Sequence, residues 1–160
     1  MDIASIADVP QVPSTVIGIG HDVVDVTAFA EQLAMPGSRM RMLFSARERR
    51  QSAMHAQQKQ DGEAVHLAAR WAGKESVLKA WCDAMDDTCP APYTLDTFPW
   101  SRIEILNDGL GCPHIVLDPD VHDHLVTSLE LDSRVGVSWH VSLSHDGSIA
   151  SAVALLAKDV

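Results

Sequence analysis

The sequence lacks the features that mark secreted, membrane-spanning or multi-domain proteins. Its 160 residues are about the length of one domain. No basic residue precedes Arg39, although a secretory signal begins with a positive region, and no apolar run approaches the roughly 18 residues that span a bilayer. The three cysteines are odd in number and form no C-x-x-C pair, so we predict reduced thiols rather than disulfides or a zinc cluster. We therefore expect a cytoplasmic protein that does not bind a membrane.

Positive charge is also scarce, and it is unevenly distributed. The chain has 12 Lys and Arg against 22 Asp and Glu, a formal net charge of −10 that disfavours nucleic acid and acidic membranes as partners. Nine of the twelve cations, however, lie between residues 39 and 79, together with only four acids. This window predicts an anionic ligand or partner nearby, although solvated charges on a helix would give the same pattern.

Hydrophobic spacing, capping residues and turn residues predict the elements of one domain. The predicted helices are 28–35, capped by Thr27; one that starts at a capping box of Ser45 and Glu48; 63–85; and 120–131. The predicted strands are 16–26; 101–106 and 114–117 as one hairpin; and 134–144 and 149–157 on either side of a turn at 145–148.

These elements do not alternate as regular βαβ units, so we predict an α+β fold. In this fold an antiparallel sheet packs against one long helix and shorter helices. Residues 1–14 contain two prolines and no sustained period, and we expect a flexible leader there. Residues 15–160 are expected to form the single domain.

Glu75 stands out because it interrupts the apolar face of the long predicted helix. Leu67, Trp71, Glu75 and Leu78 are spaced by four, four and three residues and therefore share one side. A buried carboxylate must be neutralised by a proton, an ion pair or a metal. The simplest alternative to a functional role is an ion pair with Lys79 or Arg70 on the same helix.

Asp22 stands out in the same way within the first strand. Aspartate is depleted inside strands, and Asp22 shares a strand face with Gly18 and Gly20. Glycines at these positions allow a ligand or another backbone to approach closely. A turn or a β-bulge is the alternative explanation for Asp22.

Asp22 and Glu75 together would form a site of hard oxygen ligands suited to Mg²⁺. Arg70, Lys74 and Lys79 would then hold phosphate oxygens. Such a combination suits a reaction in which a nucleophile attacks phosphorus. The sequence does not itself show that the two carboxylates meet.

A polar edge is predicted on the strand near the C-terminus. His140, Ser142 and Ser144 alternate with Trp139, Val141 and Leu143, so the first three share one strand face. This face, followed by His145, could receive a phosphate or a ribose. An ordinary exposed sheet face is the alternative.

Three motifs in order resemble one known family. They are Gly18–Val26 (GIGHDVVDV), Arg70–Ala80 (RWAGKESVLKA) and His140–His145 (HVSLSH). They resemble the signatures of the holo-acyl-carrier-protein synthases, the group I 4′-phosphopantetheinyl transferases, and most closely the actinobacterial branch. The resemblance covers about residues 14–158 and includes the order and spacing of the motifs.

The resemblance implies Mg²⁺-dependent transfer of phosphopantetheine from coenzyme A to a serine of an apo acyl carrier protein, with release of adenosine 3′,5′-bisphosphate. Asp22 and Glu75 would bind the metal, Lys79 would meet the phosphate at the reacting centre, and Glu75 or a metal-bound water would act as the base. Lys79 and Glu75 are thus the expected catalytic residues. The expected residues for coenzyme A are Arg70, Lys74, His140, Ser144 and His145.

The family also implies a homotrimer whose active sites are shared between neighbouring subunits. Members that modify free acidic carrier proteins often have arginines in the first helix, but residues 28–35 contain none. Carrier docking would then fall on Arg39, Arg41, Arg47, Arg49 and Arg50, or the acceptor would be a carrier domain within a large fatty acid synthase. No nucleic acid partner is expected.

Two other functions use the same residues. A Mg²⁺-dependent phosphohydrolase would cleave coenzyme A or a nucleotide without a protein acceptor. A regulatory module that binds coenzyme A or a nucleotide without catalysis would be expected to lack Asp22, Glu75 or Lys79, and all three are present.

Overall fold

The computed structural model describes residues 15–85, 91–132 and 135–159. The predicted leader, residues 1–14, lies outside the described residues. The helices and strands are, in chain order, β1 (Val16–Asp25), α1 (Val26–Ala34), α2 (Ala46–Lys59), α3 (Glu63–Ala84), β2 (Ile103–Asn107), β3 (Pro113–Leu117), α4 (Pro119–Ser128), β4 (Val137–Asp146) and β5 (Ile149–Lys158). The predicted α+β class is confirmed.

Two antiparallel sheets form from these strands. The larger sheet has the order β1–β5–β4, so β5 is central and β1 and β4 are the edges. In its register Asp22 lies opposite Ala152, and Ser142 lies opposite Val153. The smaller sheet is the predicted hairpin of β2 and β3, in which Ile105 lies opposite Ile115.

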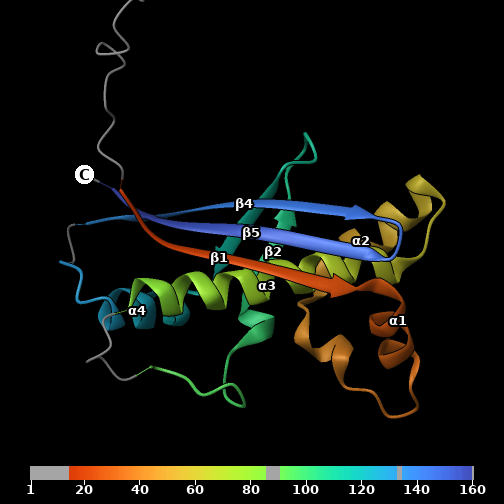
Figure 1. Ribbon diagram of the computed structural model, residues 1–160, viewed down its shortest axis with the longest axis horizontal. Helices are drawn as coiled ribbons and strands as arrows, with labels where there is room; N and C mark the ends of the chain where they lie inside the picture. The colour runs from red at the N-terminus through yellow and green to blue at the C-terminus, as the bar shows by residue number, and fades with distance from the viewer. Residues whose placement is uncertain (1–14, 86–90, 133–134, 160) are drawn as a thin grey trace, which may run out of the picture.

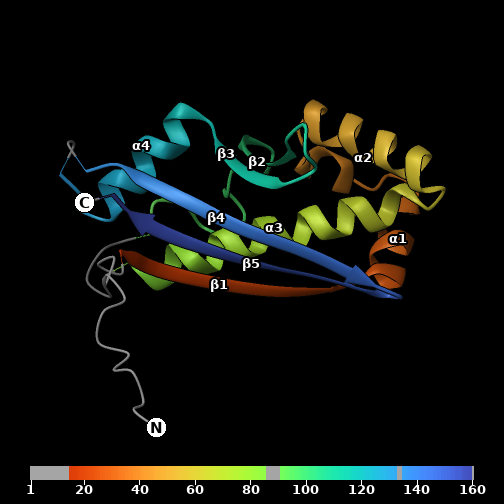
Figure 2. The same ribbon diagram turned by 90° about the horizontal axis from the view of Figure 1, so that it is seen from above.

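Helix α3 packs along one face of the larger sheet (Figure 1). Figure 2 shows α2, α4 and the β2–β3 hairpin beyond the β4 edge, and α1 at the end where β1 finishes. Buried apolar residues of α3, β2, α4 and β5 form the main core, and a second cluster centred on Phe29, Phe44 and Leu67 joins α1 to α3. The long helix is therefore the element to which the others attach.

Glycines let α3 lie unusually close to β1. A Cβ atom on Gly18 would collide with the backbone oxygen of Ala80, and one on Gly20 with that of Ser76. The expected close approach of another backbone at these glycines is thus confirmed. Ser76 also donates its hydroxyl hydrogen bond to the Ala152 oxygen of β5 at 2.9 Å, which ties the helix to the central strand.

The local capping signals are correct for α2 and wrong for α1. Ser45 and Glu48 form the predicted capping box at the start of α2. Helix α1 begins two residues earlier than expected, because Asp25 rather than Thr27 is its N-cap and accepts a hydrogen bond from Ala28 N at 2.9 Å. An aspartate at the end of a strand satisfies the first orphan amides as well as a threonine does.

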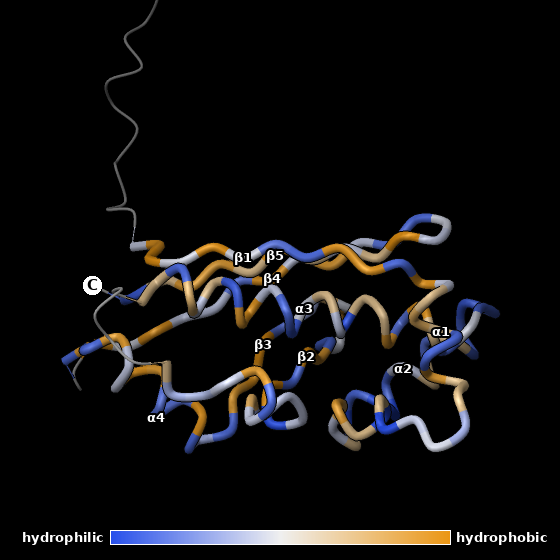
Figure 3. The backbone as a smooth tube through the Cα atoms, turned by 60° about the horizontal axis from the view of Figure 1, so that its bottom comes forward, coloured by the Kyte–Doolittle hydropathy of each residue, from blue (hydrophilic) through white to orange (hydrophobic). Residues whose placement is uncertain are grey.

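The other face of the larger sheet is open and partly apolar. Ile19 and Val23 of β1 are 55% and 53% exposed, and Val153 of β5 is also exposed. Figure 3 shows hydrophobic stretches along both strands, and none of the described helices covers this face.

None of the described helices is long and apolar enough to cross a membrane.

We predict that Gly20→Ala destabilises the protein by at least about 2 kcal/mol, because α3 must move away from β1 to admit the methyl group. Gly109→Ala is the matched control, since a Cβ atom there meets no atom within 4 Å. Urea unfolding followed by circular dichroism measures both. Equal stability of the two variants would contradict the close approach of α3 to β1 at Gly20.

Candidate active site

Asp22 is the buried carboxylate of β1. The residue is only 8% exposed, because its strand face is the one that α3 covers. Lys79 of α3 donates from Nζ to Asp22 Oδ1 at 2.8 Å and to the backbone oxygen of His21 at 3.0 Å. The second carboxylate oxygen, Oδ2, is buried and has no hydrogen-bond partner. A buried oxygen without a hydrogen-bond partner lowers the stability of the fold. Asp22 Oδ2 is therefore available to bind a cation or a donor group.

Glu75 reaches the same point from α3, one turn before Lys79. Burial raises the pKa of Glu75 to about 7, the adjacent Asp22 carboxylate raises it as well, and Lys79 opposes both effects. Two neighbouring carboxylates resist simultaneous ionisation, so a proton or another cation stabilises the pair. The simple ion pair that the sequence allowed for Glu75 is not formed, since Lys79 binds Asp22 instead.

Lys74 does not have the predicted contact with phosphate oxygens. Its side chain is fully buried and forms an ion pair with Glu48 Oε2 at 2.9 Å. Its Nζ also donates to the backbone oxygens of Trp100, at 2.6 Å, and Ile103. Glu48 in turn accepts from Ile105 N at 2.9 Å. All three donors of the ammonium group are used inside the fold, so Lys74 holds α2, α3 and β2 together rather than a ligand.

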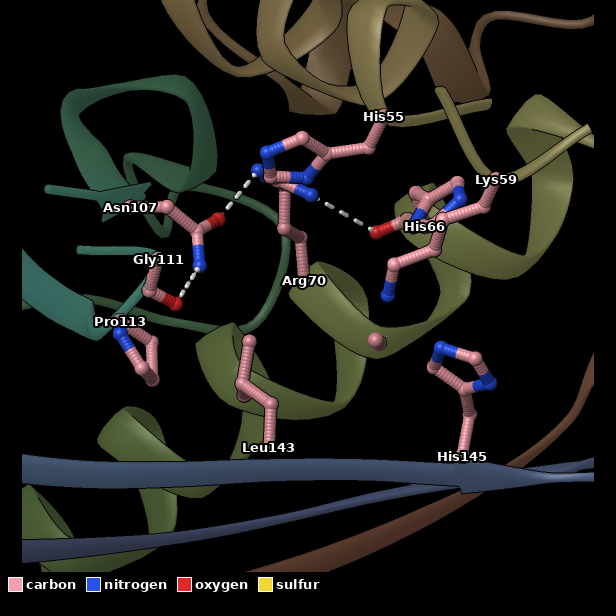
Figure 4. A pocket seen from close by; sticks show the side chains of 10 residues that line it. His55, Lys59, His66, Arg70, Asn107, Gly111, Pro113, Leu143 and His145 are labelled. Atoms are coloured by element: carbon pink, nitrogen blue, oxygen red, sulfur yellow. Dashed lines mark hydrogen bonds between the residues drawn. The ribbon is translucent and has the colours of Figure 1, made fainter. Parts of the chain in front are cut away.

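Arg70 is also buried, but it borders a cavity. Its guanidinium donates to the backbone oxygens of Ile105, at 3.1 Å, and His66, at 3.2 Å. It also donates to the side chains of Gln51, at 3.2 Å, and Asn107, at 2.8 Å. Burial lowers the pKa of Arg70, partly offset by Glu48. Figure 4 shows Arg70 between α2 and the β2–β3 hairpin.

The cavity beside Arg70 has a volume of about 270 Å³ and is lined by histidines and cations. Residues from α2, α3, the hairpin and β4 surround it (Figure 4). They are His55, Lys59, His66, Ala69, Arg70, Asn107, Gly111, Pro113, Leu143 and His145. None of the described residues that line it is acidic, so the cavity suits an anionic ligand.

Three of these residues form a row of imidazoles. The ring centroid of His66 lies 5.7 Å from that of His55 and 5.9 Å from that of His145. His66 is held by Asp61, with Nε2 and Oδ1 2.7 Å apart. Burial lowers the pKa of His55, as do the nearby Arg70 and His66. The sequence did not indicate His55 or His66, because they lie on two different helices and no local pattern shows that they meet.

His140, Ser142 and Ser144 share one face of β4, as predicted, but His145 lies on the other face. His145 and Leu143 line the cavity on the α3 side. His140 and Ser144 alternate with them and are exposed on the open face. One cavity of a single chain therefore does not contain all three of His140, Ser144 and His145.

Five of the predicted site residues form two groups within the chain, whereas Lys74 is buried in an ion pair and His140 and Ser144 lie on the open face. Asp22 lies on β1 and His145 on β4, the two edges of the sheet, with β5 between them. Arg70 and Glu75 are five residues apart on α3, which places them about 140° apart around the helix. One group is a pair of carboxylates with a lysine, and the other is a cationic cavity.

Comparison with known families identifies the class of protein. A sequence model described as the 4′-phosphopantetheinyl transferase superfamily matches residues 18–152. The chain belongs to this family.

Curated relatives and solved structures agree with this assignment. The chain is similar to a holo-[acyl-carrier-protein] synthase of Bifidobacterium animalis subsp. lactis, with 59% identity over 88% of this chain and 97% of the relative. It is 36% identical to the enzyme of that name in Mycobacterium leprae, over 88% of this chain and 96% of the relative. An ACPS–CoA complex of Chronobacterium ammoniagenes is similar in structure, with a TM-score of 0.75, 34% identity and coverage of 89% of this chain and 98% of that chain.

We predict that Glu75→Gln stabilises the metal-free protein at about pH 8 by roughly 1 to 2 kcal/mol, after allowance for the partial exposure of this side chain. Between pH 4.5 and about 7 the folded chain retains a proton that the unfolded chain releases, so the contribution of Glu75 to stability falls as pH rises through this window. The variants should therefore converge at about pH 4.5.

Denaturant unfolding at both pH values in the presence of a chelator measures this difference. Glu31→Gln on the exposed surface of α1 is the control for the loss of one negative charge. A stability difference between wild type and Glu75→Gln that does not change with pH would contradict the retention of a proton by Glu75.

Proposed function

We propose that this protein transfers 4′-phosphopantetheine from coenzyme A to a serine of an apo acyl carrier protein in fatty acid biosynthesis, with release of adenosine 3′,5′-bisphosphate. The observation that carries the proposal is the convergence of Asp22, Glu75 and Lys79, which stand in two of the family's signature motifs. The curated relatives named above support the same reaction. The protein is proposed to act in the cytoplasm.

Mg²⁺ fits the carboxylate pair. Asp22 Oδ2 is buried without a partner, and Glu75 retains a proton that a cation would replace. Among the described residues no group of three or more His, Cys, Asp or Glu could hold a metal ion, so a cation there would take its other ligands from water or substrate. Mg²⁺ commonly binds in this way, through one or two carboxylates, waters and phosphate oxygens. When bound, it would stabilise charge on the pyrophosphate oxygens.

Lys79 and Glu75 would carry the chemical step. The side chain of Lys79 is 51% exposed beside Asp22, so its ammonium is available to the transferred phosphoryl group. The serine oxygen bonds to the β-phosphorus of coenzyme A, and the bond from that phosphorus to the bridging oxygen breaks. Glu75, directly or through a water, would accept the serine proton. The leaving group is adenosine 3′,5′-bisphosphate.

The cationic cavity would bind the nucleotide end of coenzyme A. Lys59, Arg70 and His145 supply donors for phosphate there. The cavity and the carboxylate pair lie toward opposite edges of the sheet in one chain. A ligand that engages both would therefore join the cavity of one copy to the carboxylates of another, as in a homotrimer with shared active sites. The open apolar face at Ile19 and Val23 supports such an assembly.

We predict that wild-type protein with Mg²⁺ and coenzyme A adds one phosphopantetheine to an apo carrier, measured as a gain in carrier mass. Asp22→Asn, Glu75→Gln and Lys79→Met should each reduce the rate by about 100-fold or more, because each removes charge or a proton acceptor from the reacting centre. A chelator should abolish transfer by the wild type.

Glu31→Gln serves as the control variant, and far-ultraviolet circular dichroism checks that each variant is folded. The proposal fails if neither a free carrier nor a synthase-embedded carrier domain gains mass. Binding of coenzyme A without transfer would then favour a regulatory module. Release of adenosine 3′,5′-bisphosphate without any carrier would favour a phosphohydrolase.

Shared active sites predict complementation between two inactive variants. Asp22→Asn removes the metal site, and the double variant Lys59→Glu with His145→Glu repels phosphate from the cavity. Co-expression of the two chains should restore part of the activity, because some sites then combine an intact cavity with intact carboxylates. If each site belonged to a single chain, the mixture would stay as inactive as its components.

A further inference from the structure

Helix α2 has an exposed surface of one charge sign. Arg49 and Arg50 are exposed, and neither has a hydrogen bond or an ion pair among the described residues. By contrast, Arg41 is paired with Glu63 and Arg47 with Glu104. The single acid of α2, Glu48, is fully buried against Lys74. The outer surface of this helix is therefore positive and carries no carboxylate of its own.

The arrangement of residues on this surface suits a protein partner. Buried Glu48 and Ser52 define the inner side of α2. Helical spacing places Ala53, Met54 and Gln57 with Arg50 on the outer side, flanked by Arg49. Met54 is 46% exposed, so an apolar contact is available beside the two guanidinium groups. We name these five residues, Arg49, Arg50, Ala53, Met54 and Gln57, the α2 basic face.

Nucleic acid fits the α2 basic face less well. No aromatic residue is present on it to stack with a base, and its middle is formed by alanine and methionine rather than by further cations. A small apolar centre with arginines beside it is typical of protein interfaces, where arginine and methionine are enriched. The favoured occupant is therefore an acidic protein surface.

The position of α2 connects this face to the proposed reaction. The inner side of the helix contributes His55 and Lys59 to the cationic cavity. A protein docked on the outer side would lie next to the chain segment that binds the nucleotide end of coenzyme A. Outside residues 39–79 the chain has 18 of its 22 acids, which repel an acidic partner from other surfaces.

We propose that the α2 basic face docks an acidic surface of the acyl carrier that accepts phosphopantetheine. The inference rests on the proposed transferase function and adds the surface that recognises its protein substrate. Arg49 and Arg50 supply the charge that attracts and orients the carrier, and Met54 supplies the apolar contact.

The test is the double variant Arg49→Glu with Arg50→Glu in the carrier-modification assay. We expect the KM for the carrier to rise about tenfold or more, because attraction becomes repulsion at the interface. The KM for coenzyme A and the kcat should change less than about twofold, because neither residue lines the cavity or the carboxylate pair. Folding should be retained, since glutamates near the start of a helix are favourable.

Lys158→Glu is the control, because Lys158 is an exposed cation at the end of β5, away from α2. An equal rise in the KM for the carrier in this variant would overturn the proposal, since the effect would then come from the net charge of the protein and not from a docking surface on α2. An unchanged KM for the carrier in the double variant would also overturn the proposal. If the double variant bound a DNA duplex less tightly than wild type while its KM for the carrier stayed the same, the face would be a nucleic-acid site instead. Absence of transfer by the wild type would instead refute the proposed function.

Discussion

The close approach of α3 to β1 is the contact on which the rest of the structure depends. Gly18 and Gly20 have no side chains, so the backbone oxygens of Ala80 and Ser76 occupy the space that Cβ atoms would need. The next residue on that strand face is Asp22. Because the helix lies so near the strand, a carboxylate on β1 meets side chains of α3 without a loop between them. Rigid elements hold such constellations more accurately than loops do.

A second buried polar contact fixes the other side of α3. Glu48 and Lys74 are fully buried, and their pairing joins α2 to α3 and, through Ile103 and Ile105, to β2. Burying two charges is costly, and an ion pair of this kind is stable only when further hydrogen bonds satisfy both groups. Here both groups have such bonds. The same three elements carry Arg70 and line the cationic cavity, so its shape depends on this pair.

Features confined to one element and the β2–β3 hairpin could be predicted from the sequence, whereas most side-chain contacts between distant elements could not. The capping box of Ser45 and Glu48 and the length of α3 follow from local patterns. The anomalies at Asp22 and Glu75 were visible because each interrupts a regular apolar or glycine pattern. The buried role of Lys74 was not visible, since its partner is 26 residues away on another helix. The same reason hid His55 and His66, which meet only when α2 packs on α3.

The distribution of cations shows how an acidic chain can use anionic substrates. With a net charge of −10, the average field of the protein repels coenzyme A and an acidic carrier alike. Lys79 lies on α3 beside the carboxylates, and Lys59 lies at the end of α2 beside the cavity. At physiological salt, screening limits the electrostatic attraction of each lysine to a distance of about 8 Å. Local charge rather than net charge therefore guides an approaching anion. Chains that join through their open sheet faces would bring these separate positive regions together around one substrate.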